Sequence, residues 1–350
     1  MFKKLFKSAV AMLLAGVMVF SVSVEAKAAT PLRYGIDVSY HQGPINWSAV
    51  KSSGVQFAII RAGSFKSGTD AYFHQNMKGA IAAGLPVGIY VYSYATTPEM
   101  AANEGLFAVS VAKDYPVSLP IAYDIEDAYH VGMTPDQLQT LVNSFCNTVS
   151  AYGYYPMVYS SKNWFLNRIG QVSWDTWVAQ YNTACNYPYP YTFWQCTSSG
   201  SVAGINGRVD MDYQFKDYSA VIPANGFKKS GGKTFYMENY MMHRGFLTTG
   251  GATYYFDPLF GIMQTGLVAT DKGTCYFGED GKMQTGAVKI GDFQFYFDPK
   301  TGVLAPNVSV KIGKKDYITN AMGVLMEVPE MPAVPVVPVL PLPDATAVQQ

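Results

Sequence analysis

The sequence contains few cysteines. Its 350 residues include four, and none lies in a Cys-x-x-Cys pair or at a Cys/His spacing that would bind zinc. We therefore expect no metal and no cofactor. Cys185 and Cys196 bracket a ten-residue loop, and a disulfide between them or two free thiols are both compatible with the sequence.

Charged side chains are also scarce, at 14% of the chain, with 25 basic and 25 acidic residues. Residues 1–28 contain four lysines and one glutamate, so that the rest of the chain has 21 basic and 24 acidic residues and a net charge of −3. Nucleic-acid-binding proteins need a basic face. We therefore expect no nucleic-acid partner.

The chain has one long apolar run. It extends from Ala9 to Phe20 after three lysines, and the small residues Ala26 and Ala28 follow it. This pattern is typical of a secretory signal peptide, so we predict a signal peptide over residues 1–28 and a secreted, extracellular or cell-wall-associated protein. A membrane-spanning helix needs about 20 apolar residues. We therefore expect no stable membrane insertion after cleavage.

Between residues 34 and 218, short apolar segments alternate with helical segments. Thr97-Pro98 and the capping box Thr134-Pro135-Asp136-Gln137 predict helix starts, and the second helix is expected to end near Gly153. The connections between the last three predicted strands lack helical patterns. We predict a modified TIM-like β/α barrel whose later helices are lost, with a doubly wound open sheet as the alternative. The predicted strands are Tyr34–Ser39, Phe57–Gly63, Val87–Tyr94, Pro120–Asp127, Pro156–Ser161, Thr176–Asn182, Tyr191–Thr197 and Gly207–Phe215.

After residue 225, short aromatic-glycine units recur. Five tyrosines mark their register at spacings of 19, 21, 20 and 21 residues: Tyr236, Tyr255, Tyr276, Tyr296 and Tyr317. A period near twenty with aromatic strand residues and glycine turns predicts an all-β solenoid of short hairpins over residues 225–326. Residues 327–350 are rich in proline and valine, which predicts a disordered tail.

Acidic residues occur on three predicted barrel strands. Asp124 and Glu126 are two positions apart on one strand and are expected to point to the same side, whereas Asp127 points away. The first strand carries Asp37, and the last carries Asp210. Because active sites of such barrels lie at the C-terminal strand ends, these side chains are expected to converge there. Two carboxyl groups suffice for glycoside hydrolysis, although an Asp-x-Glu at a strand end is often only a solvated edge or an ion pair.

An ordered set of motifs resembles glycoside hydrolase family 25, the Chalaropsis-type lysozymes, over residues 34 to about 215. The motifs are Gly35-Ile36-Asp37-Val38-Ser39-Tyr40-His41-Gln42-Gly43 through Trp47, Val87-Gly88-Ile89-Tyr90, Tyr123-Asp124-Ile125-Glu126, Trp177-Val178-Ala179-Gln180-Tyr181, Phe193-Trp194-Gln195, and Gly204-Ile205-Asn206-Gly207-Arg208-Val209-Asp210.

The resemblance implies an N-acetylmuramidase (lysozyme) that cleaves the β-1,4 bond between N-acetylmuramic acid and N-acetylglucosamine in peptidoglycan. Glu126 matches the general acid of the family, and Asp37, Asp124 and Asp210 match its other active-site acids. We favour Asp124 as the group that orients the 2-acetamido of the substrate as internal nucleophile, and direct attack by water assisted by Asp37 or Asp210 stays open. Asp212 falls where the family more often has asparagine, so it ranks below Asp210.

Several side chains near strand ends are candidates for contacts with the sugar, with barrel packing or an internal ion pair as the alternative. They are Arg61, Tyr92, Tyr94, Tyr123, Tyr159, Trp194 and Gln195. Tyr123 and Trp194 are favoured among the aromatics, and His41 is expected at the rim or in a structural role. The alternatives are a chitinase-like or endo-N-acetylglucosaminidase barrel, which would show a longer Asp-x-x-Asp-x-Asp-x-Glu motif, and a non-catalytic wall-binding protein.

The repeats resemble cell-wall-binding repeats of the choline- and glucan-binding type. Those repeats usually carry a Gly-Trp pair whose indole helps to cage a quaternary ammonium. Here the matching positions are Gly245-Phe246, Gly266-Leu267 and Gly286-Ala287, and the sequence has no tryptophan after Trp194. We therefore predict a cell-wall polymer as ligand and doubt choline, with a structural stalk as the alternative.

Overall fold

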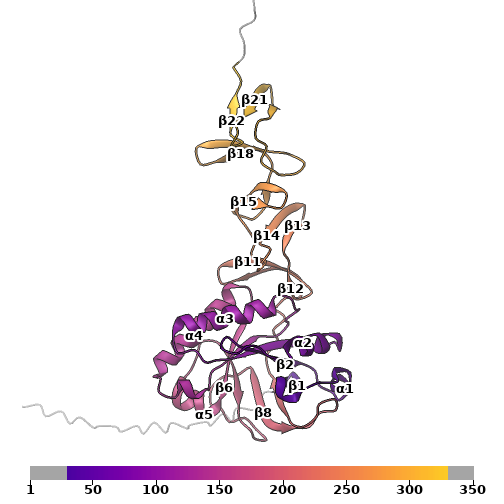
Figure 1. The fold of residues 1–350 in the computed structure, drawn as a ribbon, viewed down its shortest axis with the longest axis vertical. Coiled ribbons are helices and arrows are strands. Elements are labelled where there is room, and N and C mark those ends of the chain that lie inside the picture. The colour runs from indigo at the N-terminus through magenta and orange to yellow at the C-terminus, as the bar shows by residue number, and fades with distance from the viewer. Residues whose placement is uncertain (1–29, 330–350) are drawn as a thin grey trace, which may run out of the picture.

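The computed structural model describes residues 30–329, which form a barrel and an elongated array of hairpins that projects from one side of it (Figure 1). The predicted signal peptide at 1–28 lies outside the described residues, as does nearly all of the predicted tail. Within residues 30–329, no helix is long and apolar enough to cross a membrane.

Eight strands close the barrel in the described part of the chain. Seven run parallel in the order β1, β2, β4, β5, β6, β7, β8, and β9 closes the ring between β8 and β1. A short strand that the sequence did not predict, β3 (Gly68–Thr69), pairs antiparallel with β2. The barrel strands are β1 (Arg33–Val38), β2 (Ala58–Ser64), β4 (Val87–Tyr92), β5 (Ile121–Asp124), β6 (Pro156–Ser161), β7 (Asp175–Ala179), β8 (Phe193–Gly200) and β9 (Val209–Gln214).

The helices confirm a β/α barrel whose later helices are missing. The long ones are α3 (Pro98–Ala112) and α4 (Pro135–Ala151), and each begins as predicted, with a threonine cap followed by proline. No helix lies between β7 and β9 in this described stretch. The remaining helical elements are α1 (Trp47–Ser52), α2 (Phe73–Ala82), α5 (Lys162–Trp164) with the following π-turn Phe165–Ile169, and the 3-10 turns Tyr40–Gln42 and Ala128–His130.

The direction of β9 corrects one prediction. We expected Asp210 at the C-terminal end of the last strand, but β9 runs antiparallel to both neighbours, and Asp210 is its second residue. Asp210 lies directly opposite Asp37 in the ladder between β9 and β1. The start of β9 therefore lies at the same end of the barrel as the C-terminal ends of the other strands.

Two apolar layers hold the barrel. Aromatic side chains such as Phe57, Trp177 and Phe193 fill its interior below the acidic residues, and each is at most 1% exposed. The alternate strand residues point outward and pack against the helices, as Tyr123 does on Phe145 of α4 with ring centroids 4.3 Å apart. This alternation of side chains along each strand determines which residues can reach the cavity.

Five hairpins follow the barrel. The five register tyrosines occupy corresponding positions in their ladders, opposite Phe227, Phe246, Leu267, Ala287 and Val310. Isolated bridges such as Phe256 to Met263 and Phe297 to Leu304 supplement the hairpin ladders. The strands are β10 (Gly226–Ser230), β11 (Lys233–Glu238), β12 (Met241–Met242), β13 (Gly245–Thr249), β14 (Ala252–Phe256), β15 (Gly266–Thr270), β16 (Gly273–Phe277), β17 (Met283–Gln284), β18 (Gly286–Ile290), β19 (Phe293–Phe297), β20 (Ser309–Ile312), β21 (Lys315–Thr319) and β22 (Leu325–Glu327).

The first hairpin packs on the C-terminal end of α4. Ser230 Oγ donates to the carbonyl of Ser150 at 2.7 Å. Gly153 has φ +85°, and a Cβ there would lie 2.6 Å from Met242 Cε and 3.1 Å from the Phe235 ring, so both the conformation and the close approach require glycine. Helices of a β/α barrel run opposite to the strands, so this contact lies at the end of the barrel remote from the C-terminal strand ends.

Candidate active site

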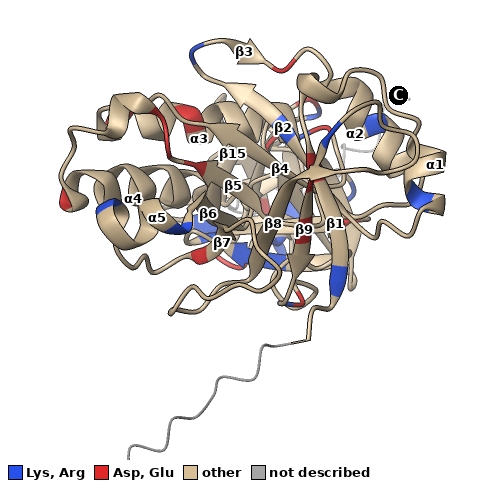
Figure 2. Ribbon diagram, turned by 90° about the horizontal axis from the view of Figure 1, so that it is seen from below, with Lys and Arg blue, Asp and Glu red and all other residues tan. Residues whose placement is uncertain are grey.

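A cavity of about 460 Å³ opens at the C-terminal strand ends and collects four acidic side chains from three regions of the barrel. Figure 2 shows acidic positions on β9 among the strands of the barrel. The cavity is lined by Asp37, Tyr40, His41, Arg61, Tyr90, Tyr92, Tyr94, Asp124, Glu126, Tyr159, Trp177, Tyr181, Gln195, Ser198 and Asp210.

Glu126 and Asp124 occupy different environments. Strand β5 ends at Asp124, so the prediction that it continues to Asp127 is wrong, and Glu126 lies in the segment after the strand. Asp124 is 5% exposed, and its Oδ1 has no hydrogen-bond partner among the described residues. Glu126 is partly exposed, and its Oε2 accepts a bond from the Ser161 amide at 3.3 Å.

Asp37 and Asp210 form a second carboxyl pair. Asp37 is 4% exposed, and the Gln195 amide donates to its Oδ2 at 2.6 Å. The carbonyl of that amide accepts bonds from the hydroxyls of Tyr159 at 2.9 Å and Tyr181 at 3.2 Å. Since the amide oxygen is held in this way, its nitrogen is fixed toward Asp37.

Burial raises the pKa of every carboxyl group that lines the cavity. Burial raises the pKa of Asp124 well above its usual range, and the charge of Glu126 raises it further. Burial and the charge of Asp210 do the same for the pKa of Asp37. Burial also raises the pKa of Glu126, and that of Asp210 to about 6. A raised pKa keeps a carboxyl group protonated to higher pH than usual, which favours general acid catalysis.

One cation faces these acids. Arg61, from β2, is the only lysine or arginine that lines the cavity, and its guanidinium lies 5.6 Å from the Tyr40 ring centroid and 5.5 Å from that of Tyr92. Its charge lowers the pKa of Asp124 against the effect of burial. Arg61 therefore favours ionisation of Asp124.

The predicted sugar contacts divide into two groups. Arg61, Tyr92, Tyr94, Tyr159 and Gln195 line the cavity, and the exposed His41 lines it as well.

Tyr123 and Trp194 do not line it, so we no longer assign them as sugar contacts. Tyr123 is fully buried in the outer layer, where its hydroxyl accepts a bond from Ser93 at 2.8 Å. Trp194 packs on Tyr213 and donates its indole N–H to the Gln180 carbonyl at 2.8 Å. Each precedes an inward residue, Asp124 or Gln195, and therefore points outward.

Four aromatic residues of the lining were not predicted from the sequence. Tyr40, Tyr90, Trp177 and Tyr181 complete its walls. Tyr90 is two positions before Tyr92 on the same strand, so the alternation that places Tyr92 in the cavity also predicts Tyr90 there. Trp177 and Tyr181 are the first and last residues of the motif Trp177-Val178-Ala179-Gln180-Tyr181, for which the sequence predicted no contact with the sugar.

Asp212 lies beneath the cavity and is fully buried. Its Oδ1 accepts the Trp177 indole N–H at 2.9 Å. Burial raises the pKa of Asp212 well above its usual range, and the charge of Asp37 raises it further. Oδ2 has no partner while both acids are ionised, and a proton on Asp212 would supply a hydrogen bond to Asp37. A protonated Asp212 would therefore hold the Asp37 carboxylate in place through this hydrogen bond.

Asp127 has a local structural role. Its Oδ1 accepts from the Tyr129 amide at 2.9 Å and its Oδ2 from the Tyr92 hydroxyl at 3.0 Å. The four cysteines are free thiols, Cys185 and Cys196 included. Within residues 30–329, no group of three or more His, Cys, Asp or Glu side chains is arranged to hold a metal ion.

Comparison with known proteins finds relatives of the barrel. Lysozyme M1 of Streptomyces globisporus is 31% identical over 195 residues, which are 50% of this chain and 65% of that protein. The autolytic lysozyme of Clostridium acetobutylicum is 30% identical over 181 residues, 51% of this chain and 54% of that protein. The uncharacterized protein YegX of Escherichia coli K12 is 30% identical over 191 residues, 51% of this chain and 68% of that protein. The chain thus covers less than two thirds of either lysozyme.

A closed β/α barrel that gathers carboxyl groups among aromatic rings at its C-terminal strand ends has the architecture of a barrel glycosidase. The model of glycosyl hydrolases family 25 matches residues 36–205, and that of the choline-binding repeat matches residues 264–308. The chain belongs to glycosyl hydrolase family 25.

Proposed function

We propose that this protein is a secreted N-acetylmuramidase (lysozyme), anchored to the cell wall by its hairpins. In this proposal, residues 34–218 are the catalytic unit, residues 225–326 the wall-binding unit, and peptidoglycan the substrate. The observation that carries it is the cavity, in which an accessible glutamate with a raised pKa lies beside a buried aspartate that has one unpartnered oxygen. The lysozyme names of two relatives of the barrel support the same activity.

Glu126 is the proposed general acid. It is partly exposed at the mouth of the cavity, and burial raises its pKa, so it retains a proton at higher pH than an ordinary glutamate. A protonated carboxyl can donate its proton to the glycosidic oxygen as the bond breaks. The Ser161 amide that bonds to Oε2 opposes the rise in pKa and holds the carboxyl in place.

Asp124 is the proposed partner that orients the 2-acetamido group. Its free Oδ1 can accept an N–H donor from the substrate, and a substrate amide would satisfy this buried acceptor. Arg61 lowers the pKa of Asp124 and so opposes the larger rise that burial and Glu126 cause. Asp37 and Asp210 are fixed on the facing strands by Gln195 and by their ladder register. In the alternative mechanism, direct attack by water, Asp37 or Asp210 would assist the water.

The hairpins are proposed to bind a wall polymer through their aromatic surfaces. Phe246 packs on Tyr255 with centroids 4.8 Å apart, which offers an apolar platform to a glycan. Choline is a poor fit at this position, because the Lys272 ammonium already lies 4.3 Å from the Phe246 ring centroid and occupies the place of a quaternary ammonium.

A pair of variants tests the proposed acid. Glu126→Gln keeps the size of the side chain and removes the titratable proton, so we expect it to abolish clearing of purified peptidoglycan while retention on cell walls persists. Glu99→Gln is the matched control, since Glu99 is exposed on α3 and does not line the cavity. Clearing by Glu126→Gln at the wild-type rate would remove Glu126 from the mechanism.

A further inference from the structure

A second cavity lies at the junction between the barrel and the first hairpin. It has a volume of about 530 Å³, within the range of small-molecule sites. Its barrel wall includes Pro156 and Asp175, the first residues of β6 and β7, and its other wall comes from β10. The cavity is therefore at the opposite end of the barrel from the acidic cavity.

A buried lysine lines this second cavity. Lys228 is 8% exposed, and its ammonium has no hydrogen-bond or ion-pair partner among residues 30–329. Burial lowers the pKa of Lys228 to about 8, because no neighbouring acid compensates the lost hydration. A buried cation without a partner is costly, and an anionic ligand would supply the missing partner.

Among the five hairpins, lysine is buried at this ladder position only in the hairpin that faces the barrel. Lys228 pairs with Phe235 in its ladder, and the residues at the corresponding position of the next three hairpins are Leu247, Val268 and Val288. The last hairpin has Lys311 there, which is exposed and forms an ion pair with Asp316 at 3.7 Å. An aliphatic side chain is thus sufficient for packing at this position. Only in the first hairpin is the lysine at this position buried in the wall of a cavity.

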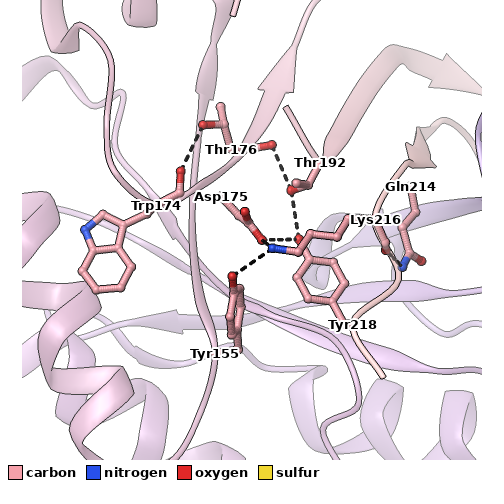
Figure 3. Close-up of polar contacts among 8 residues, drawn as sticks. All are labelled: Tyr155, Trp174, Asp175, Thr176, Thr192, Gln214, Lys216 and Tyr218. Carbon is pink, nitrogen blue, oxygen red and sulfur yellow. Dashed lines mark hydrogen bonds and ion pairs between the residues drawn. The ribbon is translucent and has the colours of Figure 1, made fainter. Parts of the chain in front are cut away.

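The one acidic residue of the lining is already neutralised by a neighbour. Figure 3 shows Asp175 bound by Lys216, whose ammonium lies 2.7 Å from Oδ2 and also donates to the Tyr155 hydroxyl at 3.0 Å. The Tyr218 hydroxyl donates to the same carboxylate oxygen at 2.9 Å. The lining therefore presents the charges of Lys228 and Lys229 without a matching acid.

The remaining walls are aromatic and hydroxylic. The rings of Tyr155, Trp174 and Phe227 line the cavity together with Ser173. The Trp174 indole N–H is held by Asn143 at 2.9 Å, which fixes the ring. Flat apolar rings stack on sugar rings, and hydroxyl groups bond to theirs. We propose that this junction cavity binds an acidic sugar, a pyranose with one carboxylate or phosphate group, and that Lys228 is the counter-ion of that group.

The test measures sugar binding by the full chain through the indole N–H signal of Trp174 in nitrogen-15 NMR spectra, assigned with Trp174→Phe. The probes are D-glucuronate for the carboxylate, D-glucose 1-phosphate for the phosphate, and neutral D-glucose. We expect at least one acidic probe to shift the signal saturably, with an affinity at least tenfold higher than that of glucose. The probe that binds identifies the anionic group.

Lys228→Met tests the role of the lysine. The variant should fold, because aliphatic residues occupy the corresponding positions of the next three hairpins, and we expect it to bind the acidic probe at least tenfold more weakly. Lys289→Met, at an exposed lysine of β18, is the control and should bind normally. Equal binding by Lys228→Met, equal affinity for glucose, or no shift with either acidic probe would each overturn the proposal. If Lys228→Met does not fold, the ranking of the three probes on the wild type decides. Retained probe binding in Glu126→Gln separates this result from the proposed lysozyme activity.

Discussion

The acidic cavity should weaken the fold at neutral pH, and Asp210→Asn measures by how much. Burial raises the pKa of Asp210 from 3.8 to about 6 in the folded protein. A carboxyl whose folded pKa is raised favours folding when protonated, so this contribution is fully present below pH 3.8 and is lost as the pH rises through about 6. An asparagine, which has no charge to desolvate, avoids the loss.

The magnitude follows from the same pKa values. Each pKa unit corresponds to 1.36 kcal/mol, so the pKa difference of about 2 gives an upper limit of about 3 kcal/mol for the gain in stability at pH 8. Solvent screens part of this effect because Asp210 is only partly buried, so we expect a gain of about 1–2 kcal/mol. For a domain of this size, each kcal/mol raises the melting temperature by about 2–4 °C. The variant should therefore melt about 2–8 °C higher at pH 8 and at nearly the wild-type temperature at pH 4.

Calorimetry of both proteins at the two pH values is the assay. Asp217→Asn is the control with the opposite sign, since hydrogen bonds from Ser219 lower the pKa of Asp217 and that variant should lose stability at pH 8. An Asp210→Asn protein that melts at or below the wild-type temperature at pH 8 would refute the reasoning. The desolvation of the cavity would then not be a cost to folding.

Two further predictions concern the acidic cavity and the hairpins. Gln195→Leu removes the 2.6 Å hydrogen bond to Asp37, and a hydrogen bond to a charged group is worth about 1.5–3 kcal/mol. We therefore expect kcat/KM on purified peptidoglycan to fall by about 10–100-fold. Undiminished activity would exclude a role of Gln195 in positioning Asp37. Phe246→Ala removes the ring that packs on Tyr255, so retention of the full chain on cell walls should weaken, whereas Leu259→Ala, at an exposed loop residue, should not change it. Wild-type retention by Phe246→Ala would leave the hairpins as a stalk.

The sequence predicted the barrel because its signals are local. An apolar strand segment or a capped helix start, such as Thr134 with Gln137, can be recognised from residues only a few positions apart. The strand β3 was missed because two residues carry no periodic pattern. The direction of β9 was missed because no local signal distinguishes a parallel strand from an antiparallel one, and the connection after β8 has no helix to imply a crossover.

The cavity lining was predicted less completely than the barrel. Alternation along β5 places Asp124 inward, and the same alternation requires Tyr123 to point outward, so their joint assignment to the cavity was inconsistent. The same applies to Gln195 and Trp194. Lys228 could not be predicted as a binding residue, because its burial depends on how the first hairpin packs on the barrel.

The chemical identity of the product tests the central proposal most directly. Peptidoglycan digested with the wild-type protein is reduced with borohydride and analysed by mass spectrometry, with the Glu126→Gln protein as the blank. We predict that the new reducing ends are N-acetylmuramic acid and that they are absent from the blank. New reducing ends of N-acetylglucosamine would contradict the proposal, since the enzyme would then cleave the other glycosidic bond of the polymer.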